Sequence, residues 1–248
     1  MEICSPNQKS SKVEARPTAL RKGPERSRPP GLFYDVCRLM WLGIFGFTMR
    51  IRTFGLERVD PCGGMIIAVS HVSHLDPIIV SALIRRRISW VSRIEFFQQW
   101  FMRTILTHGG AFQVNRNGSA LPTMREGLRR LARGEAVGIF PEGELMRGKN
   151  SVLRGAKIKH GVCLLAARSG CPVLPVIVLG ADHLGRIGPW LPAKRGRLWI
   201  YVGQPIYSKE LRNNHQSRTK FAESLTAEYV SLYREMRVKF DLPESIMP

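Results

Sequence analysis

The sequence predicts an α/β protein in which a mostly parallel central sheet is flanked by helices. Short apolar runs alternate with longer amphipathic stretches along the chain, the order expected when strands and covering helices alternate. With 248 residues, 44% of them hydrophobic, the chain is long enough for one domain with a substantial core. A basic stretch and an apolar segment precede the alternating part.

Residues 1–31 are predicted to be a disordered basic extension, because they are rich in Ser, Pro, Lys and Arg and lack an apolar pattern. Residues 32–58 are predicted to be a membrane-associating segment. Their apolar run at residues 39–49, flanked by Arg38 and Arg50, is too short to cross a bilayer, which takes about 20 residues. It is long enough to enter one leaflet. The alternative is a core helix packed on the sheet.

The remaining residues, 59–248, are predicted to form the main domain. Apolar runs predict strands at residues 65–70, 88–92, 110–114, 136–140, 173–178 and 197–202. The stretches between and after them predict helices at residues 77–86, 94–106, 119–133, 155–168 and 216–239. The last helix carries an apolar face, formed by Phe221, Leu225, Tyr229, Leu232 and Met236, which indicates packing rather than chemistry.

A histidine and an aspartate five residues apart lie in the loop SHVSHLD at residues 70–76, between the first of these strands and the next helix. If this loop coils, the Asp76 carboxylate reaches one ring nitrogen of His71 and fixes its tautomer. A neutral imidazole held in this way is a standard general base for a hydroxyl proton. The other interpretation is a loop histidine beside a helix-capping aspartate. His74 has no carboxylate at the matching spacing, which indicates a surface or lining residue.

Three further blocks follow this loop: GAFQVNR at residues 110–116, FPEG at 140–143 and CPVLPVIV at 171–178. In this order, the four blocks resemble the phospholipid/glycerol acyltransferase family, typified by bacterial 1-acylglycerol-3-phosphate acyltransferase. The resemblance covers about residues 60–205 and makes 59–248 an acyltransferase domain. It implies that a fatty acyl group passes from acyl-CoA or acyl carrier protein to lysophosphatidate, giving phosphatidate.

The resemblance also implies roles for single residues. His71 is expected to deprotonate the acceptor hydroxyl, and Asp76 to orient His71. Arg116 is expected to hold the acceptor's phosphate, because the planar guanidinium suits that group. Arg93 is expected to be a second phosphate contact, although an ordinary solvated arginine is an equal alternative.

Two other blocks are expected to shape the substrate pockets. Glu142 and Gly143 would form part of the acceptor pocket, with the glycine letting the backbone approach the ligand. Pro175 would lie near the acyl chain or thioester, unless it only marks an edge strand.

The chain departs from the family pattern directly after FPEG. The usual continuation is Thr-Arg-Ser, whereas this chain continues with ELMR at residues 144–147. Leu145 therefore stands where the family has a phosphate-binding arginine, and Glu144 adds a negative charge. Arg147 is expected to compensate in part. An acceptor with another headgroup, a different lysophospholipid or lyso-lipid, stays open.

A net charge of +19 predicts an anionic partner, and the basic extension with its apolar segment indicates an anionic membrane surface. We expect monotopic or peripheral attachment to the cytoplasmic face. Nucleic acid is not an expected partner, since zinc-finger spacing, RNP-type aromatics and a basic helix joined to heptads are all missing from the sequence. The alternative from another class is a catalytically silent protein that binds lipid or nucleic acid.

The five cysteines are odd in number and include no Cys-x-x-Cys pair, which indicates reduced thiols in the cytosol. The sequence shows no zinc-site spacing and no glycine-rich phosphate loop. We therefore expect neither a bound metal nor a cofactor, with the acyl thioester serving as a co-substrate.

Overall fold

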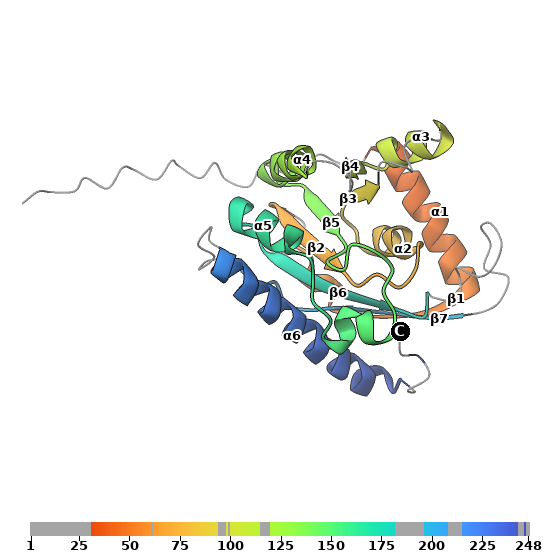
Figure 1. Cartoon of the computed structure of the whole chain (residues 1–248). Coiled ribbons are helices and arrows are strands. Elements are labelled where there is room, and N and C mark those ends of the chain that lie inside the picture. The colour runs from red at the N-terminus through yellow and green to blue at the C-terminus, as the bar shows by residue number, and fades with distance from the viewer. Residues whose placement is uncertain are drawn as a thin grey trace, which may run out of the picture.

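The computed structural model has a central sheet with helices on both faces (Figure 1). It describes residues 31–60, 62–93, 98, 100–114, 120–181, 196–207, 215–242 and 246. The predicted disordered extension at residues 1–31 therefore lies outside the described residues, except for Gly31.

The sheet has seven strands in the order β1-β7-β6-β2-β5-β3-β4. All neighbouring strands are parallel except the antiparallel pair β6–β7, which confirms the mostly parallel sheet. The strands are β1 (Met49–Phe54), β2 (Met65–Val69), β3 (Ile88–Arg93), β4 (Phe112–Val114), β5 (Ala136–Ile139), β6 (Val173–Leu179) and β7 (Gly196–Val202).

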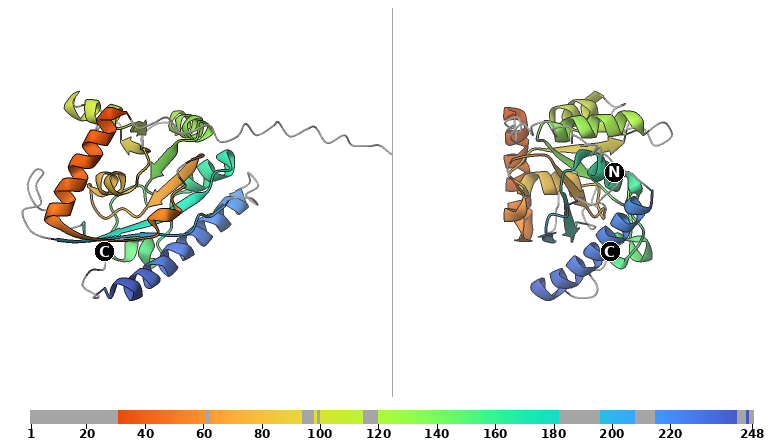
Figure 2. Two further views of the ribbon diagram at one scale, coloured as in Figure 1. Left: turned by 180° about the vertical axis from the view of Figure 1, so that it is seen from behind. Right: turned by 90° about the vertical axis from the view of Figure 1, so that its left-hand side faces the viewer.

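Six α-helices complete the described fold: α1 (Leu32–Thr48), α2 (Asp76–Leu83), α3 (Trp100–His108), α4 (Leu121–Ala132), α5 (His160–Ser169) and α6 (His215–Phe240). Short 3-10 turns are η1 (Leu56–Arg58), η3 (Gly148–Asn150) and η4 (Val152–Arg154). Figure 2 shows α1 and α2 on one side of the sheet and α5 and α6 on the other.

Strand β2 lies at the centre of the sheet, and all five of its residues are buried. Ile66 and Ala68 belong to the apolar core shared with α4, α5 and α6. Ile67 and Val69 belong to the core on the other face, shared with α1 and α2. This burial on both faces explains why β2 reads as a continuous apolar run rather than an alternating one.

The segment predicted to associate with a membrane, residues 32–58, contributes to the main fold. Its helix ends at Thr48, and residues Met49–Phe54 form edge strand β1, parallel to β7. The sequence from Met49 alternates apolar and basic residues, a period of two that suits a strand. Strand β1 thus joins this segment to the sheet of the main domain. Among the described helices, none is both long and apolar enough to cross a bilayer.

One helix begins later than the sequence predicted, and the predicted start of another lies outside the described residues. Helix α5 begins at His160 rather than near residue 155, because Gly155 adopts a left-handed conformation and Lys159 is extended. The Lys159 N–H instead donates to the carbonyl of Pro141, which ties this stretch to the end of β5. Helix α3 begins at Trp100, and the first part of the predicted helix falls on residues 94–97 and 99, outside the described residues.

Candidate active site

The candidate site lies beyond the carboxyl ends of two adjacent strands. The paired strands β2 and β5 are parallel, so the loops that follow them emerge at the same edge of the sheet. His71 follows β2 and Glu142 follows β5, as the sequence predicted. Sites in open α/β sheets are usually found at this edge.

His71 and Asp76 are in direct contact. The Nδ1 atom of His71 lies 3.0 Å from Oδ2 of Asp76, which has no exposed side-chain surface, while 14% of the His71 side chain is exposed. The same carboxylate oxygen accepts hydrogen bonds from the backbone N–H groups of Val72 and Ser73, at 2.9 and 2.8 Å. The loop therefore wraps around the carboxylate, which contacts Nδ1 of His71 and not Nε2.

Asp76 is both the orienting carboxylate and the first residue of α2, where the helix dipole favours negative charge. Burial raises the pKa of Asp76, and the hydrogen bonds from His71, Ser73 and Val72 act in the opposite direction. Its other oxygen, Oδ1, has no hydrogen-bond partner among the described residues. A buried carboxylate with all its bonds on one oxygen is a costly arrangement, and such arrangements are concentrated at functional sites.

An aromatic stack supports the His71 ring. The ring of Phe140 stacks on His71 with centroids 3.8 Å apart, and Trp90 in turn stacks on Phe140 at 5.2 Å. A Cβ atom at Gly138 would lie 2.6 Å from the Trp90 side chain, so glycine leaves room for this ring. Sequence reasoning assigned no role to Phe140 or Trp90, and only the position of Phe140 in the FPEG block was a signal.

Glu142 binds the loop that carries His71. One Glu142 carboxylate oxygen accepts from the backbone N–H of His71 at 2.7 Å, and the other accepts from Val152 N–H at 2.8 Å and the Ser151 hydroxyl at 3.3 Å. Only 4% of Glu142 is exposed, and burial raises its pKa against the effect of these hydrogen bonds. The FPEG turn and η4 are thereby joined to the histidine loop.

The residues after FPEG also contact this loop. The Met146 N–H donates to the carbonyl of His71 at 3.1 Å. Together with Glu142, the segment at residues 142–146 therefore binds both the backbone N–H and the backbone carbonyl of His71. Gly143 has a φ of +76°, and a Cβ there would lie 2.7 Å from the Lys159 side chain. Lys159 Nζ lies 3.8 Å from Glu144 Oε1. The structure thus places a lysine beside the negative charge that distinguishes this chain from the family pattern.

Three of the other predicted site residues are the arginines Arg93, Arg116 and Arg147. Arg147 is exposed and follows Met146 directly, so it lies near the His71 loop. Arg116 lies outside the described residues, as does the side chain of Arg93, whose backbone ends β3. Their predicted phosphate contacts stay predictions.

Pro175 lies inside the sheet and not at its edge. Strand β6 is bounded by β7 and β2, so the edge-strand interpretation of this proline is wrong. The Pro175 carbonyl accepts from Gly203 N–H, which puts the missing proline N–H on the β7 side, where the ladder begins only at Val176 and Val202. Three residues further on, the N–H of Val178 donates to the Ser70 hydroxyl at 3.3 Å and fixes the start of the histidine loop.

Fold and site together define an α/β enzyme with a histidine–aspartate pair at the carboxyl edge of its sheet. The family to which the chain belongs is the Acyltransferase family, whose family model matches residues 50–179, slightly more than half of the chain. The protein is therefore an acyltransferase, as the sequence predicted.

Similar proteins agree with this membership. A 1-acyl-sn-glycerol-3-phosphate acyltransferase of Bacillus subtilis (strain 168) is 21% identical over 178 residues, which cover 71% of this chain and 84% of the relative. One of Borreliella burgdorferi is 24% identical over 137 residues, covering 54% of this chain and 53% of the relative. The crystal structure of the 1-acyl-sn-glycerophosphate (LPA) acyltransferase PlsC from Thermotoga maritima has a TM-score of 0.65 and 17% identity, covering 85% and 81% of the two chains. At this identity, the structure supports the fold alone.

Proposed function

We propose that this protein transfers a fatty acyl group from an acyl thioester, acyl-CoA or acyl carrier protein, to the free hydroxyl of lysophosphatidate. The product is phosphatidate, an intermediate of phospholipid biosynthesis. The acyltransferase activity named for the two bacterial relatives supports this acceptor, and the His71–Asp76 contact supports the chemistry. A different lysophospholipid is the alternative acceptor, favoured by Leu145 at the position of the family's arginine.

The observation that carries the proposal is the 3.0 Å contact between His71 Nδ1 and the fully buried Asp76 carboxylate. An ionised Asp76 has no proton to donate and acts only as an acceptor. Nδ1 of His71 therefore carries the proton, and Nε2 keeps its lone pair. Nε2 then removes the proton from the acceptor hydroxyl, and the buried charge of Asp76 stabilises the imidazolium that forms.

The reaction balances without a further group. The acceptor oxygen attacks the thioester carbonyl carbon, the new C–O bond forms, and the C–S bond breaks as the tetrahedral intermediate collapses. The proton held on His71 passes to the leaving thiolate, which regenerates the neutral base. No metal ion is required by this scheme, and no group of His, Cys, Asp and Glu side chains suited to hold one occurs among the described residues. The expectation of no cofactor stays a prediction.

The acceptor's phosphate is expected to be bound by Arg116, with Arg93 as a second contact and Arg147 as a partial replacement for the family's arginine. Lys159 is an additional candidate that sequence reasoning did not identify. Its ammonium lies 3.8 Å from Glu144 and close to Gly143. These two residues follow Glu142 in the sequence, and the Glu142 carboxylate binds the backbone of His71. Because Lys159 and Glu144 are both substantially exposed, their ion pair is weak and an incoming phosphate can compete for the lysine.

Attachment to the cytoplasmic face of a membrane is part of the proposal. Helix α1 buries Tyr34 and Phe45, but large apolar side chains on its other side are exposed. These are Leu32, Phe33, Val36, Leu39, Met40 and Phe47, and most of them follow the spacing of one helix face. An apolar face of this length suits a helix lying in the membrane interface, and the exposed Arg50 and Arg52 of β1 suit anionic lipid. Arg38 instead donates to the Ala82 carbonyl at 3.1 Å.

A direct assay tests the proposed function. Purified protein is mixed with a long-chain acyl-CoA and a panel of acceptors: lysophosphatidate, lysophosphatidylcholine, lysophosphatidylglycerol and lysophosphatidylethanolamine. We expect thiol release that depends on the acceptor, with phosphatidate as the main product identified by mass spectrometry. Thiol release with a lysophospholipid other than lysophosphatidate would support the alternative acceptor. Neither thiol release nor product with any acceptor, using CoA or carrier-protein thioesters, would contradict the proposal.

A further inference from the structure

A charged cavity lies at the amino ends of the strands, at the opposite end of the sheet from His71. It has a volume of about 410 Å³ and is lined by Arg87, Ser89, Thr107, Gly110, Arg129, Arg130, Arg133 and Glu135. Ser89 is the second residue of β3. Gly110 lies two residues before β4, and Glu135 directly precedes β5. These are the amino ends of parallel strands, whereas His71 follows the carboxyl end of β2. The cavity is therefore separate from the candidate active site.

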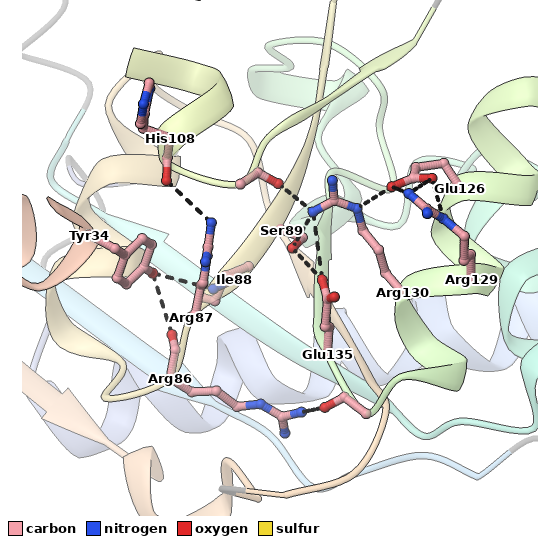
Figure 3. Close-up of polar contacts among 12 residues, drawn as sticks. Tyr34, Arg86, Arg87, Ile88, Ser89, His108, Glu126, Arg129, Arg130 and Glu135 are labelled. Carbon is pink, nitrogen blue, oxygen red and sulfur yellow. Dashed lines mark hydrogen bonds and ion pairs between the residues drawn. The ribbon is translucent and has the colours of Figure 1, made fainter. Parts of the chain in front are cut away.

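Two of its arginines are paired with carboxylates (Figure 3). Arg129 forms two hydrogen bonds of 2.8 Å to Glu126, and Arg130 donates to Glu126 at 2.7 Å. Arg130 also donates to the Ser89 hydroxyl and the Gly110 carbonyl, both at 2.7 Å, and lies 3.6 Å from Glu135. These contacts use most of the N–H donors of Arg130. They also give the carboxylates of Glu126 and Glu135 their partners.

The other two arginines have no carboxylate partner among the described residues. Arg87 donates to the His108 carbonyl at 3.3 Å and lies over the Tyr34 ring at 5.8 Å (Figure 3). Arg133 is exposed just beyond the end of α4. Four guanidinium groups thus line a cavity to which only one carboxylate, Glu135, contributes directly. This positive excess, together with the hydroxyl of Thr107, favours an anion with several acceptor oxygens.

We propose that this cavity binds a phosphate group, with Arg87 and Arg133 as its principal contacts. Guanidinium groups bind phosphate through paired N–H donors, and the volume lies within the range of small-ligand sites. Arg129 and Arg130 add positive potential without having to leave their partners. The site is independent of the acceptor's phosphate, which must lie near His71.

The phosphate can come from a membrane lipid or from a soluble molecule. The lipid source is favoured by position, because the rim of the cavity adjoins the start of α1. Phe33 of α1 contacts His108 of α3 with ring centroids 5.3 Å apart, and Arg87 binds the carbonyl of that same His108. The exposed apolar side chains of α1, including Leu32 and Val36, therefore begin beside the cavity.

A charge-matched pair of double variants tests the proposal in the full-length chain. Arg87→Gln/Arg133→Gln removes the two principal contacts. Arg125→Gln/Arg234→Gln removes the same charge from exposed positions of α4 and α6 outside the cavity lining. Binding is measured to vesicles of phosphatidylcholine with and without phosphatidate, and to inorganic phosphate by calorimetry. Thermal unfolding checks that both variants fold. If the cavity double variant fails to fold, the single variant Arg133→Gln is used in its place.

We expect the cavity variant to weaken binding by about tenfold or more relative to the control, the loss typical of a removed charge-assisted hydrogen bond. A loss confined to phosphatidate vesicles identifies a lipid headgroup, a loss confined to inorganic phosphate identifies a soluble ligand, and a parallel loss in both assays shows that the phosphate group itself is what the cavity binds. Equal binding by the two variants in both assays, or no phosphate binding by the unmodified protein in either, overturns the proposal.

Discussion

Replacement of His71 by alanine is expected to lower the rate of acyl transfer by about 10²- to 10⁴-fold, the usual contribution of a general base. The protein should stay folded, because Asp76 keeps its hydrogen bonds from the N–H groups of Val72 and Ser73. The rate of thiol release from acyl-CoA at saturating lysophospholipid measures the effect, and circular dichroism checks the fold.

His74→Ala is the matched control. His74 lies in the same loop, is exposed, and has its ring centroid 6.5 Å from that of His71, but it does not contact Asp76. We expect its activity to remain within about threefold of the unmodified protein, since it removes neither the base nor its orienting group. Full activity in His71→Ala, or an equal loss in both variants, would sink the assignment of His71 as the base.

Glu142→Ala is expected to destabilise the protein by about 2 to 4 kcal/mol, because it leaves the N–H groups of His71 and Val152 without their acceptor in a buried site. Relief of the buried charge, whose cost is seen in the raised pKa of Glu142, offsets part of this loss. Activity should fall as well, since the backbone of His71 is no longer fixed. Urea denaturation followed by tryptophan fluorescence gives the free energy of unfolding.

Two variants show whether the hydrogen bonds are responsible. Glu142→Gln keeps the size of the side chain but has one acceptor oxygen where the carboxylate has two, so one buried N–H should face an amide NH2 group and stability should still fall. Glu144→Ala removes an exposed carboxylate two residues away, and should change the free energy of unfolding by less than about 0.5 kcal/mol. Equal stability of Glu142→Ala and Glu144→Ala would show that the Glu142 contacts do not hold the loop.

The sequence predicted the central contact of the site because that contact is local. Asp76 lies at the start of α2 and only five residues after His71, so strand, loop and helix signals sufficed to bring the two together. The strands β2, β5 and β6 were also predictable, since burial on both faces makes them continuous apolar runs. Strand β1 was missed, because its apolar residues extend the run that ends α1.

Long-range contacts were less accessible to sequence reasoning. Glu142 was expected to line the acceptor pocket, yet its carboxylate contacts the backbone of a residue 71 positions earlier in the chain. The stacking of Trp90 on Phe140, which itself stacks on His71, depends on the register of β3 against β5, which no local pattern specifies. The cavity at the amino ends of the strands likewise assembles arginines that in the sequence resemble ordinary solvated charges.

The central claim is that His71 and Asp76 act as one catalytic unit, and a double-mutant cycle tests it most directly. Asp76→Asn keeps the shape of the side chain: one oxygen of Asp76 accepts all three hydrogen bonds, so the asparagine oxygen can replace it, while the charge is lost and an amide NH2 group takes the place of the unpartnered Oδ1. We expect Asp76→Asn alone to slow acyl transfer by about tenfold to 100-fold, the value of a charge-assisted hydrogen bond.

The rate of thiol release by His71→Ala/Asp76→Asn decides the matter. If Asp76 acts only through His71, the double variant is as slow as His71→Ala alone, because the aspartate has nothing left to orient or stabilise. If the two losses multiply, or if Asp76→Asn keeps full activity, the residues do not act as a unit and this account of the site is contradicted.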